Sequence, residues 1–589
     1  MKQFLKMTFA SMLGFILAGL LIFVIFLGIV ASALSFTKKQ VVEVPANTVL
    51  QITLDQPVND RASEDPMSYL NFRDMTANKP MGLTEILESI KRASADKKVS
   101  GIFLDLAEIP ASIATIEEIH NSLLDFKKSG KFIISYSEGY NQKAYYIASV
   151  SDKIYLNPAG SMEFKGLSGQ VMFFKGLLEK LDIEAQVIRH GKFKSAVEPF
   201  ILDKMSEPSK VQTLSYVSAI WDHMLQGISD ARKLPAADLT AIADNHKIQT
   251  PEDAVANKLV DKLMYKDQLL DELKARVSAK SVKDIHVMKL SKYMDAPKPE
   301  KREALAKDRI AVIYAQGSIV SGNGDDQNIG SERISKAIRK ARMDEKVKAI
   351  VLRVNSPGGS ALASDVIWRE VTLARKEKPV VVSMGDLAAS GGYYISCAAN
   401  KIFASPNTLT GSIGVFGIVP NMQKFFDKNL GITFDEVKTN PYADYIPTTR
   451  PMTEAEKGFL TNDIEHIYAT FLSHVAEGRH MSVAAIDSIG QGRVWSGTDA
   501  KRLGLIDEFG GLKDAVAEAA KMAKIEKYRI ISLPEQKDAF TQIIEAFSGD
   551  ETSVLKKELG AAYPYLKYLQ NMSRMEGVQA MLPYDIRIE

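Results

Sequence analysis

Short apolar runs alternate with amphipathic stretches along most of the chain, and this alternation predicts its secondary structure. The runs at 49–54, 102–106 and 132–136 have the length and the apolar content of buried strands. Between the last two, residues 113–128 repeat apolar positions about every 3.6 residues, which predicts a helix. Because strands alternating with helices are typical of parallel sheets covered by helices, we expect an α/β fold.

The same order of elements returns in the second half of the chain. Runs at 310–314, 349–353 and 380–384 predict a second set of strands. Tyr145 and its two successors recur at Tyr393, an offset of 248 positions (145 to 393). A duplicated module is the simplest account of this self-similarity.

Related closing segments and a charged connector set the expected domain limits. Residues 247–261 match 493–507 at an offset of 246 positions (261 to 507), so each copy closes in the same way. The stretch between the copies is charged and contains prolines, as linkers do. We therefore expect a cytoplasmic stub with a transmembrane anchor at 1–40, a first repeat at 45–295, a linker at 296–308, a second repeat at 309–535 and a tail at 536–589.

An almost unbroken apolar stretch covers residues 9–36. As a helix, these 28 positions would be about 42 Å long, more than the roughly 30 Å of bilayer hydrocarbon, so we expect them to span a membrane. A cleaved signal peptide is the alternative, since residues 31–33 (Ala-Ser-Ala) resemble a cleavage site. The apolar stretch is longer than the usual signal-peptide core of about 7 to 15 residues, which favours the anchor.

The charges that flank this stretch predict its orientation only weakly. Lys2, Lys6 and the amino terminus precede it, and Lys38 and Lys39 follow. The small excess of positive charge at the leading end predicts an amino terminus in the cytoplasm and a bulk outside it.

Composition excludes several classes of function. The formal net charge is +2, so no excess of either sign indicates a nucleic-acid partner. Cys397 is the only cysteine, which excludes an intrachain disulfide and a cysteine-based metal site. The eight histidines are scattered without a zinc-binding spacing, so we expect no metal cofactor.

Two glycine-rich loops follow neighbouring strands of the second copy. Residues 355–360 contain Gly358 and Gly359, and the next strand ends at Ser390 and Gly391. The carboxyl ends of parallel strands meet at one edge of the sheet, where ligands bind. Backbone N–H groups of such loops can stabilise an oxyanion, although each loop alone would also fit a simple turn.

Ser390 is the candidate nucleophile, since the glycine after it would leave its hydroxyl exposed. The first copy has Gln142 at the corresponding position, so only the second copy carries the serine.

Lys194 is the candidate base, because neither repeat offers an obvious histidine partner for the serine. A free lysine has a pKa of about 10.4, and burial of its stem could lower that pKa enough for the amine to act as a base. The second copy has Ala443 at this position, after one added residue. Ser412 could orient the lysine or simply form a glycine-flanked turn, and His190 is the alternative base.

Four motifs in this order resemble protease IV, the signal peptide peptidase A family, in its long duplicated form. The similarity runs from the anchor to about Asp507. The motifs are Lys-Ser-Ala-Val-Glu-Pro-Phe at 194–200, Asn-Ser-Pro-Gly-Gly at 355–359, Ala-Ala-Ser-Gly-Gly-Tyr at 388–393 and Leu-Thr-Gly-Ser-Ile-Gly-Val at 409–415.

The resemblance implies a Ser/Lys-dyad serine peptidase built from tandem Clp-protease/crotonase-like domains. It implies a bacterial inner-membrane anchor, a catalytic part on the periplasmic side and no cofactor. Residue by residue it implies Ser390 as nucleophile, Lys194 as general base, Gly358, Gly359 and Gly391 as the oxyanion loops, and Ser412 as a hydroxyl that assists the lysine.

The resemblance also implies partners. The family degrades released signal peptides and other apolar peptides, and its long members resemble homotetramers that enclose a cavity. Two alternatives stay open at this point, a crotonase-type acyl-CoA enzyme and a non-catalytic membrane scaffold. The sequence also leaves open whether Lys194 and Ser390 meet within one chain or between chains.

Overall fold

The structure is a computed structural model. It describes most of the chain apart from the predicted linker and the predicted tail. The predicted linker at 296–308 and the predicted tail at 536–589 lie mostly outside the described residues. The described residues are 2–37, 42–62, 70–71, 76–77, 81–297, 306–325, 327–536, 578–582 and 587–588.

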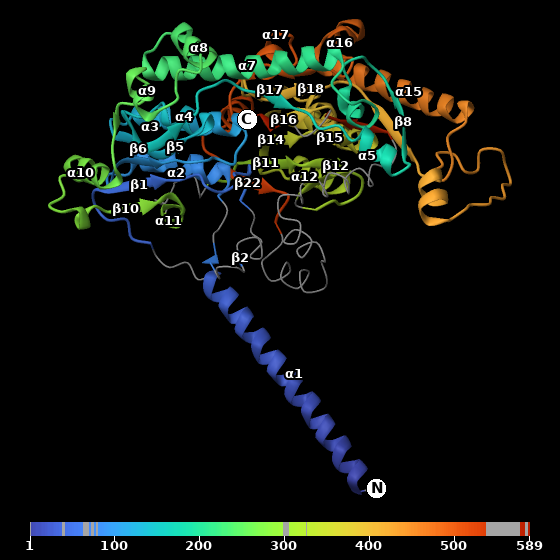
Figure 1. Ribbon diagram of the computed structural model, residues 1–589, viewed down its shortest axis with the longest axis horizontal. Helices are drawn as coiled ribbons and strands as arrows, with labels where there is room; N and C mark the ends of the chain where they lie inside the picture. Colours follow the sequence, from blue (N-terminus) through green and yellow to red (C-terminus); the bar gives the residue numbers. More distant parts are fainter. Residues whose placement is uncertain are drawn as a thin grey trace.

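The first helix, α1 (Lys2–Thr37), leads away from a layered body that contains almost all other elements (Figure 1). Over the described part of the chain, no helix combines the length and the apolar character that crossing a membrane requires.

The two halves of the body contain comparable sets of elements. The first half contains β1 (Thr48–Ile52), β2 (Leu70–Asn71), β3 (Thr76–Ala77), α2 (Leu83–Ala95), β4 (Val99–Asp105), α3 (Ile113–Lys127), β5 (Phe132–Tyr140), α4 (Gln142–Ala148), β6 (Lys153–Met162), β7 (Gly169–Gln170), α5 (Lys175–Lys180), β8 (Glu184–Arg189), the 3-10 helix η2 (Ser195–Val197), α6 (Glu198–Ile201), α7 (Glu207–Arg232), α8 (Ala236–Asp244), α9 (Pro251–Ala256), β9 (Lys262–Leu263), α10 (Lys266–Arg276), the 3-10 helix η3 (Val282–Asp284), β10 (Val287–Lys289) and α11 (Leu290–Met294). The second half contains β11 (Arg309–Gln316), β12 (Ser318–Val320), β13 (Asn328–Gly330), α12 (Ser331–Met343), β14 (Val347–Ser356), β15 (Gly358–Ser360), α13 (Ala361–Glu377), β16 (Val380–Ala389), α14 (Gly391–Ser396), β17 (Lys401–Ala404), β18 (Leu409–Gly411), β19 (Phe416–Asn421), the π-helix η5 (Phe425–Leu430), α15 (Glu454–Arg479), α16 (Val483–Ile489), β20 (Val494–Ser496), α17 (Gly497–Arg502), β21 (Glu508–Phe509), α18 (Leu512–Met522), β22 (Arg529–Leu533), β23 (Gln579–Met581) and β24 (Arg587–Ile588).

Each half builds a parallel sheet with the same strand order. The first sheet runs β10-β1-β4-β5-β6-β9, and every neighbouring pair in it is parallel. The second sheet contains the matching path β22-β11-β14-β16-β17-β21, again with parallel neighbours. The predicted α/β fold with a tandem duplication is confirmed.

The duplication is visible in single hydrogen bonds. Tyr145 donates its hydroxyl to the Leu259 carbonyl at 2.8 Å, and Tyr393 donates to the Leu505 carbonyl at the same distance. These pairs are related by the offsets found in the sequence. The repeated tyrosine therefore fixes the same helix to the same closing segment in both copies.

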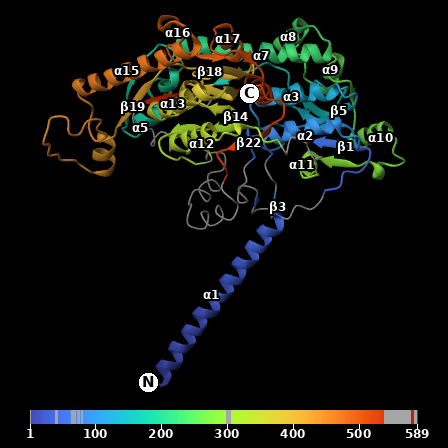
Figure 2. The ribbon, with the colours of Figure 1, turned by 180° about the vertical axis from the view of Figure 1, so that it is seen from behind.

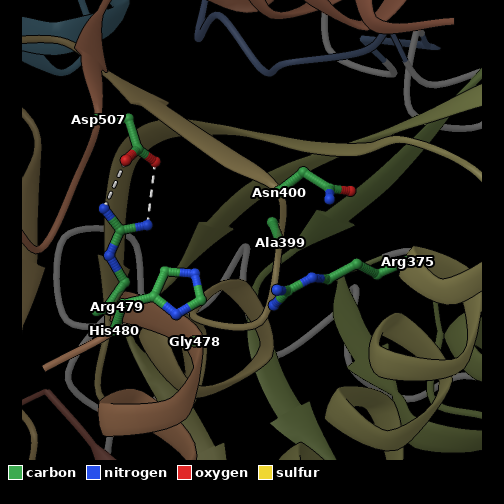
Figure 3. A pocket seen from close by; sticks show the side chains of 7 residues that line it. All are labelled: Arg375, Ala399, Asn400, Gly478, Arg479, His480 and Asp507. Atoms are coloured by element: carbon green, nitrogen blue, oxygen red, sulfur yellow. Dashed lines mark hydrogen bonds and ion pairs between the residues drawn. The ribbon is translucent and has the colours of Figure 1, made fainter.

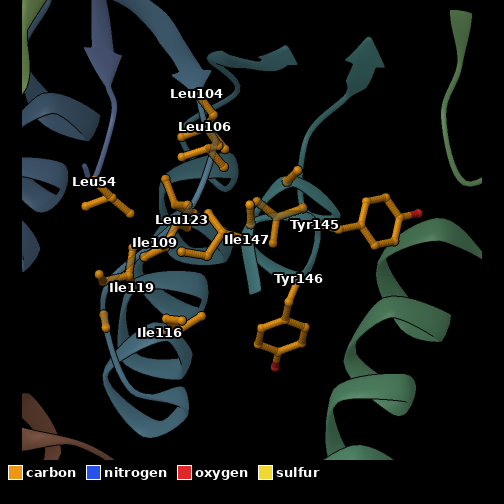
Figure 4. Close-up of a cluster of buried hydrophobic side chains, with 14 of the residues drawn as sticks. Leu54, Leu104, Leu106, Ile109, Ile116, Ile119, Leu123, Tyr145, Tyr146 and Ile147 are labelled. Carbon is orange, nitrogen blue, oxygen red and sulfur yellow. The ribbon is translucent and has the colours of Figure 1, made fainter. Parts of the chain in front are cut away.

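Helices cover both faces of each sheet, so the strands are apolar on both sides. In β4, Ile102 and Leu104 join the large cluster that α3 and α4 complete (Figure 4), whereas Phe103 joins a separate cluster. In β11, Ala311 and Val312 likewise belong to two different clusters. This division follows from the two-residue period of a strand, and it explains the nearly continuous apolar runs of the sequence.

A third sheet joins the two halves, in the order β13-β12-β15-β23-β19-β8. In it, β8 of the first half pairs antiparallel with β19 of the second, with 184–189 opposite 416–421. Figure 1 shows α5 and β8 beside second-half elements, and Figure 2 shows α5 next to β19. The stretch 45–295 is therefore not a self-contained unit, and the segment after β8 is delivered to the second repeat.

Candidate active site

Ser390 lies at the junction of β16 and α14 and is fully buried. Its backbone has φ 55° and ψ −114°, a conformation that is rare for a residue with a side chain. Its N–H donates to the Gly411 carbonyl at 2.8 Å, which helps to hold this turn. Strain of this kind costs about 1 to 3 kcal/mol and persists only where the surrounding structure imposes it, often at functional sites.

Lys194 follows β8, and its segment is bound tightly to the second repeat. The Phe193 N–H donates to the Gln491 carbonyl at 3.0 Å. Gln212 of α7 donates to the Phe193 carbonyl at 3.0 Å and accepts from the Val494 N–H at 3.1 Å. These bonds set the position of the lysine from both repeats.

The two candidate residues meet within one chain. Lys194 Nζ lies 2.9 Å from Ser390 Oγ, and both side chains are fully buried. The same Nζ lies 3.0 Å from Ser412 Oγ and 3.2 Å from the Ser412 carbonyl oxygen. The amine therefore has three oxygen partners, and one of them is the candidate nucleophile.

Burial lowers the pKa of Lys194 well below its ordinary value of 10.5, because a buried ammonium loses its hydration. Desolvation causes this shift, and no carboxylate in the part of the chain that the structure describes offsets it by favouring the charged form. The ring of Phe416 lies 5.9 Å from Nζ and contributes to the apolar surroundings.

The three partners match what a neutral amine can offer, which is two N–H donors and one lone pair. The Ser412 carbonyl can only accept, so it takes one N–H. Ser412 Oγ donates to the Gly492 carbonyl at 3.4 Å, so its oxygen can accept the other N–H. The lone pair is left for the Ser390 hydroxyl. This hydroxyl also lies 3.4 Å from the Gly414 carbonyl, to which it can donate, so it must turn from that weak bond toward Nζ for proton transfer.

Two of the predicted oxyanion glycines, Gly358 and Gly391, differ in what they contribute. Gly358 has φ 101°, and a side-chain carbon there would lie 2.8 Å from the Gly391 nitrogen. Its own N–H donates to Ser356 Oγ at 3.1 Å, so Gly358 provides space instead of a donor. Gly391 is the first residue of α14, where an N–H has no acceptor within the helix.

Ser412 combines the two interpretations that the sequence left open. It sits in a turn with φ 49°, and its N–H donates to the Arg493 carbonyl at 2.7 Å. Its hydroxyl and carbonyl oxygens also contact Lys194 Nζ. His190, the alternative base, has other partners: its Nδ1 lies 2.7 Å from Glu465, and its ring stacks on Tyr468.

The corresponding position of the first repeat is closed by hydrogen bonds. Gln142, the counterpart of Ser390, is the first residue of α4, whereas Ser390 lies immediately before α14. Its Oε1 accepts from the N–H groups of Lys165 and Gly166 at 2.8 and 2.9 Å, and its Nε2 donates to the Gly166 carbonyl. This side chain braces a loop and offers no nucleophile.

A polar hollow of about 210 Å³ lies elsewhere on the second repeat (Figure 3), and none of the predicted site residues lines it. Its main feature is the ion pair between Arg479 and Asp507 at 2.8 Å. The first repeat has the matching pair of Arg232 and Asp261 at 3.2 Å. Since both copies keep this pair, we interpret it as structural.

Sequence reasoning missed the residues that make room for the lysine. Gly492 has φ 77°, and a side-chain carbon there would lie 2.6 Å from Lys194 Cβ. At Gly414 such a carbon would lie 3.4 Å from Lys194 Cδ. In the sequence, the one sign of this role is that both residues are glycines. The reason for the glycines is seen only in the structure, where the docking of β8 on β19 brings Lys194 next to them.

Comparison with known proteins identifies the family. The model of peptidase family S49 matches residues 125–280 and 372–526, which places one matched segment in each half. The chain belongs to peptidase family S49. The Clp protease model also matches residues 300–410, in agreement with the fold of the second repeat.

Relatives of this S49 peptidase are similar over most of their length. Protease 4 of Salmonella typhi is 37% identical over 82% of this chain and 78% of its own. Protease 4 of Haemophilus influenzae is 32% identical over 93% of this chain and 91% of its own. The chloroplastic serine protease SPPA of Arabidopsis thaliana is 33% identical over 86% and 74%. The family favours a serine peptidase over the acyl-CoA enzyme and the scaffold.

Proposed function

We propose that this S49 peptidase is a serine endopeptidase in which Ser390 is the nucleophile and Lys194 the general base. The observation that carries the proposal is the 2.9 Å contact between Nζ and Oγ in a buried site. The lowered pKa of Lys194 supports it, because a base must be uncharged to take a proton.

The reaction is acyl transfer through a covalent intermediate. Lys194 takes the Ser390 proton while Oγ attacks a peptide carbonyl, and Lys194 then gives this proton to the leaving amine. Water attacks the acyl-enzyme by the same route in reverse. Gly359 and Gly391 have the backbone N–H groups that would stabilise the oxyanion, and Ser412 acts as a positioning residue for the lysine.

The substrates that we propose are released signal peptides and other apolar, unstructured peptides. The catalytic residues are fully buried, so a folded protein surface could not reach them. A homotetramer that encloses the sites would restrict access further.

We also propose that residues 9–36 anchor the protein in the bacterial inner membrane, with the catalytic part on the periplasmic side. The apolar sequence of this stretch supports the anchor, and large side chains of α1 such as Phe9, Phe15 and Leu21 are exposed. Membrane fractions of the full chain and of a chain that begins at residue 42 test it, since only the full chain should resist carbonate extraction.

The dyad is tested with purified full-length protein and an unstructured apolar peptide. We expect Ser390→Ala and Lys194→Met each to lower kcat/KM by at least about 10³-fold, because members of such a unit fail together. A serine-directed acylating agent should label the parent and not Ser390→Ala, as intact mass shows.

Two matched controls accompany these variants. Lys192→Met removes an exposed lysine two positions from Lys194, and Gln142→Ala changes the first-repeat counterpart of Ser390. Both should keep peptide hydrolysis. Full activity in Ser390→Ala or Lys194→Met would remove the dyad assignment.

A further inference from the structure

A residue with a rare backbone conformation supports the segment that carries Lys194. Gln491 lies in the turn between α16 and β20 and has φ 55°, which is uncommon for a residue with a side chain. Its carbonyl accepts from the N–H of Phe193, the residue before Lys194, at 3.0 Å. A side-chain carbon at Gly191 would lie 2.5 Å from the same carbonyl oxygen. The turn at Gln491 therefore forms the surface against which the lysine segment lies.

Two side chains hold Gln491 in this conformation. The Gln491 N–H donates to the hydroxyl of Tyr468 in α15 at 3.1 Å, and its Nε2 donates to Asp487 of α16 at 2.5 Å. Tyr468 donates its hydroxyl to the same Asp487 oxygen at 2.6 Å. Because burial raises the pKa of Tyr468, the hydroxyl keeps the proton that this bond needs. A strained backbone persists only where the surrounding structure imposes it, and this ring of three hydrogen bonds does so.

The strain at Gln491 is not a shared feature of the two copies. At the offset of 246 positions that relates the closing segments (261 to 507), Gln491 corresponds to Asn245, which has φ −98°. Gly492 corresponds to His246, and both of these are left-handed, with φ 77° and 46°. The second copy therefore has one more left-handed residue in a turn that both copies contain. That residue lies where the turn contacts the lysine segment.

The side chains that hold Gln491 are likewise specific to the second copy. Helices α7 and α15 begin and end at an offset of 247 positions (207 to 454), which aligns Tyr468 with Trp221. Helices α8 and α16 follow residues 235 and 482 at the same offset, which aligns Asp487 with Thr240. An indole has no hydroxyl, and Thr240 donates its own hydroxyl to a carbonyl of its helix at 3.0 Å. The arrangement around Gln491 therefore belongs to the copy whose turn contacts the lysine.

Tyr468 also contacts the lysine segment directly. Its ring stacks on the ring of His190, with 3.8 Å between the ring centroids. The segment is thus held at His190 by the ring and at Phe193 by the turn that the hydroxyl supports. These two points lie on either side of Gly191, where the chain turns with φ 89°. One side chain therefore supports the lysine segment at two places.

We propose that Tyr468 is a positioning residue for the general base. Through Gln491 and Phe193 it keeps Lys194 Nζ directed at the Ser390 hydroxyl. The inference rests on the proposed function, since it concerns the same dyad. Tyr468 acts on the geometry of the site, because its hydroxyl bonds to α16 and to the turn. A displacement of reacting groups by about 1 Å can lower a rate about 100-fold, so this support bears on kcat.

The test is Tyr468→Phe in the purified full-length protein, assayed with the unstructured apolar peptide. This change removes the hydroxyl and keeps the ring that stacks on His190. We expect kcat to fall by about 10- to 100-fold with KM nearly unchanged, because the chemical step loses its alignment while the peptide-binding residues stay. We also expect the acid limb of kcat/KM to move to higher pH, because a loosened turn admits water to Lys194.

Tyr293→Phe is the matched control. Tyr293 of α11 is also buried and also donates its hydroxyl to an aspartate, Asp96, at 3.0 Å. Both variants lose one such bond, so both should have a lower urea midpoint than the parent. Only Tyr468→Phe should change kcat and the acid limb. If its kcat and acid limb equal those of Tyr293→Phe, the hydroxyl of Tyr468 serves stability alone and the inference is overturned.

A second variant tests the same support from another residue. Asp487→Ala removes the acceptor that Tyr468 and Gln491 share, so we expect the same fall in kcat and the same shift of the acid limb. It replaces Tyr468→Phe if that variant does not fold, and a kcat equal to that of the parent in Asp487→Ala also overturns the inference. Full activity in Lys194→Met contradicts the proposed function instead. Loss of activity in Lys194→Met, together with the parent's kcat and acid limb in Tyr468→Phe, contradicts this inference alone.

Discussion

At the scale of single residues, the central property of the site is a lysine that has no carboxylate partner among the described residues. Lys194 is fully buried, and its polar contacts are hydroxyl and carbonyl oxygens of Ser390 and Ser412. These three oxygens could accept hydrogen bonds from either form of the amine, but a buried ammonium loses its hydration, so the neutral form is favoured. The surroundings therefore select the protonation state that a base requires.

This lysine predicts the pH dependence of the reaction. In the proposed mechanism the neutral form is active, so kcat/KM should be high above the pKa of Lys194 and should fall as pH decreases through it, by about tenfold per pH unit. Because burial lowers that pKa, the midpoint of this acid limb should lie well below 10.5. The measurement is kcat/KM between pH 5 and about 11 on a peptide without titratable groups.

The pH dependence of the free energy of unfolding gives an independent measure of the pKa of Lys194. Between the lowered pKa and 10.5 the unfolded state binds the lysine proton and the folded state does not, so the free energy of unfolding rises with pH. Lys194→Met should lack this contribution, and urea titrations compare it with the parent. Lys192→Met, which changes an exposed lysine, should leave the pH dependence of kcat/KM and of the free energy of unfolding unchanged. If the midpoint of the acid limb of kcat/KM lay near pH 10.4, the value of a free lysine, it would contradict a buried neutral base.

At the scale of elements, the site depends on how closely the loop before β20 approaches the lysine segment. Gly492 lies in this loop with φ 77°, and Gly504 has φ 76° in another turn. A side chain at Gly492 would meet the backbone and Cβ of Lys194, whereas at Gly504 the nearest atom would be Met481 Sδ at 3.8 Å.

This pair of glycines supplies a matched test. Both Gly492→Ala and Gly504→Ala force a left-handed alanine, which costs about 1 to 2 kcal/mol. Only Gly492→Ala displaces Lys194, and a displacement of about 1 Å can lower the rate about 100-fold. We therefore expect a lower urea midpoint for Gly492→Ala than for Gly504→Ala, and a loss of kcat, measured without urea, in Gly492→Ala alone. Equal activity of the two would show that the lysine does not depend on this approach.

The elements also show how far the sequence alone reaches. Apolar runs predicted the strands at 102–106 and 380–384, which the structure extends to Val99–Asp105 and Val380–Ala389. Such runs are local, so periodicity finds them. The pairing of β8 with β19 connects residues more than 200 positions apart (189 to 416), and no local pattern encodes it. Comparison of the two copies nevertheless singled out Ser390 and Lys194, because each lies where the other copy lacks its chemistry.

At the scale of the whole molecule, the two repeats must stay fixed against each other, because each supplies one side of the site. A buried ion cluster crosses between them. Arg353 of β14 donates to Asp60 at 2.8 Å and to Glu118 of α3 at 2.7 Å. Burial raises the pKa of Glu118 even though Arg353 opposes the shift, so the cluster depends on its arginine.

The last prediction concerns this cluster. Arg353→Met should lower the free energy of unfolding by about 3 to 5 kcal/mol, because it leaves two buried carboxylates unpaired. Lys513→Met is the matched control, since the ion pair of Lys513 with Asp125 at 3.0 Å also crosses between the repeats but is exposed. An exposed pair contributes at most about 1 kcal/mol. Urea unfolding gives both values, and peptide hydrolysis should fail at a lower urea concentration in Arg353→Met, since Ser390 and Lys194 lie on different repeats. Equal midpoints for the two variants would show that the buried cluster does not hold the repeats together.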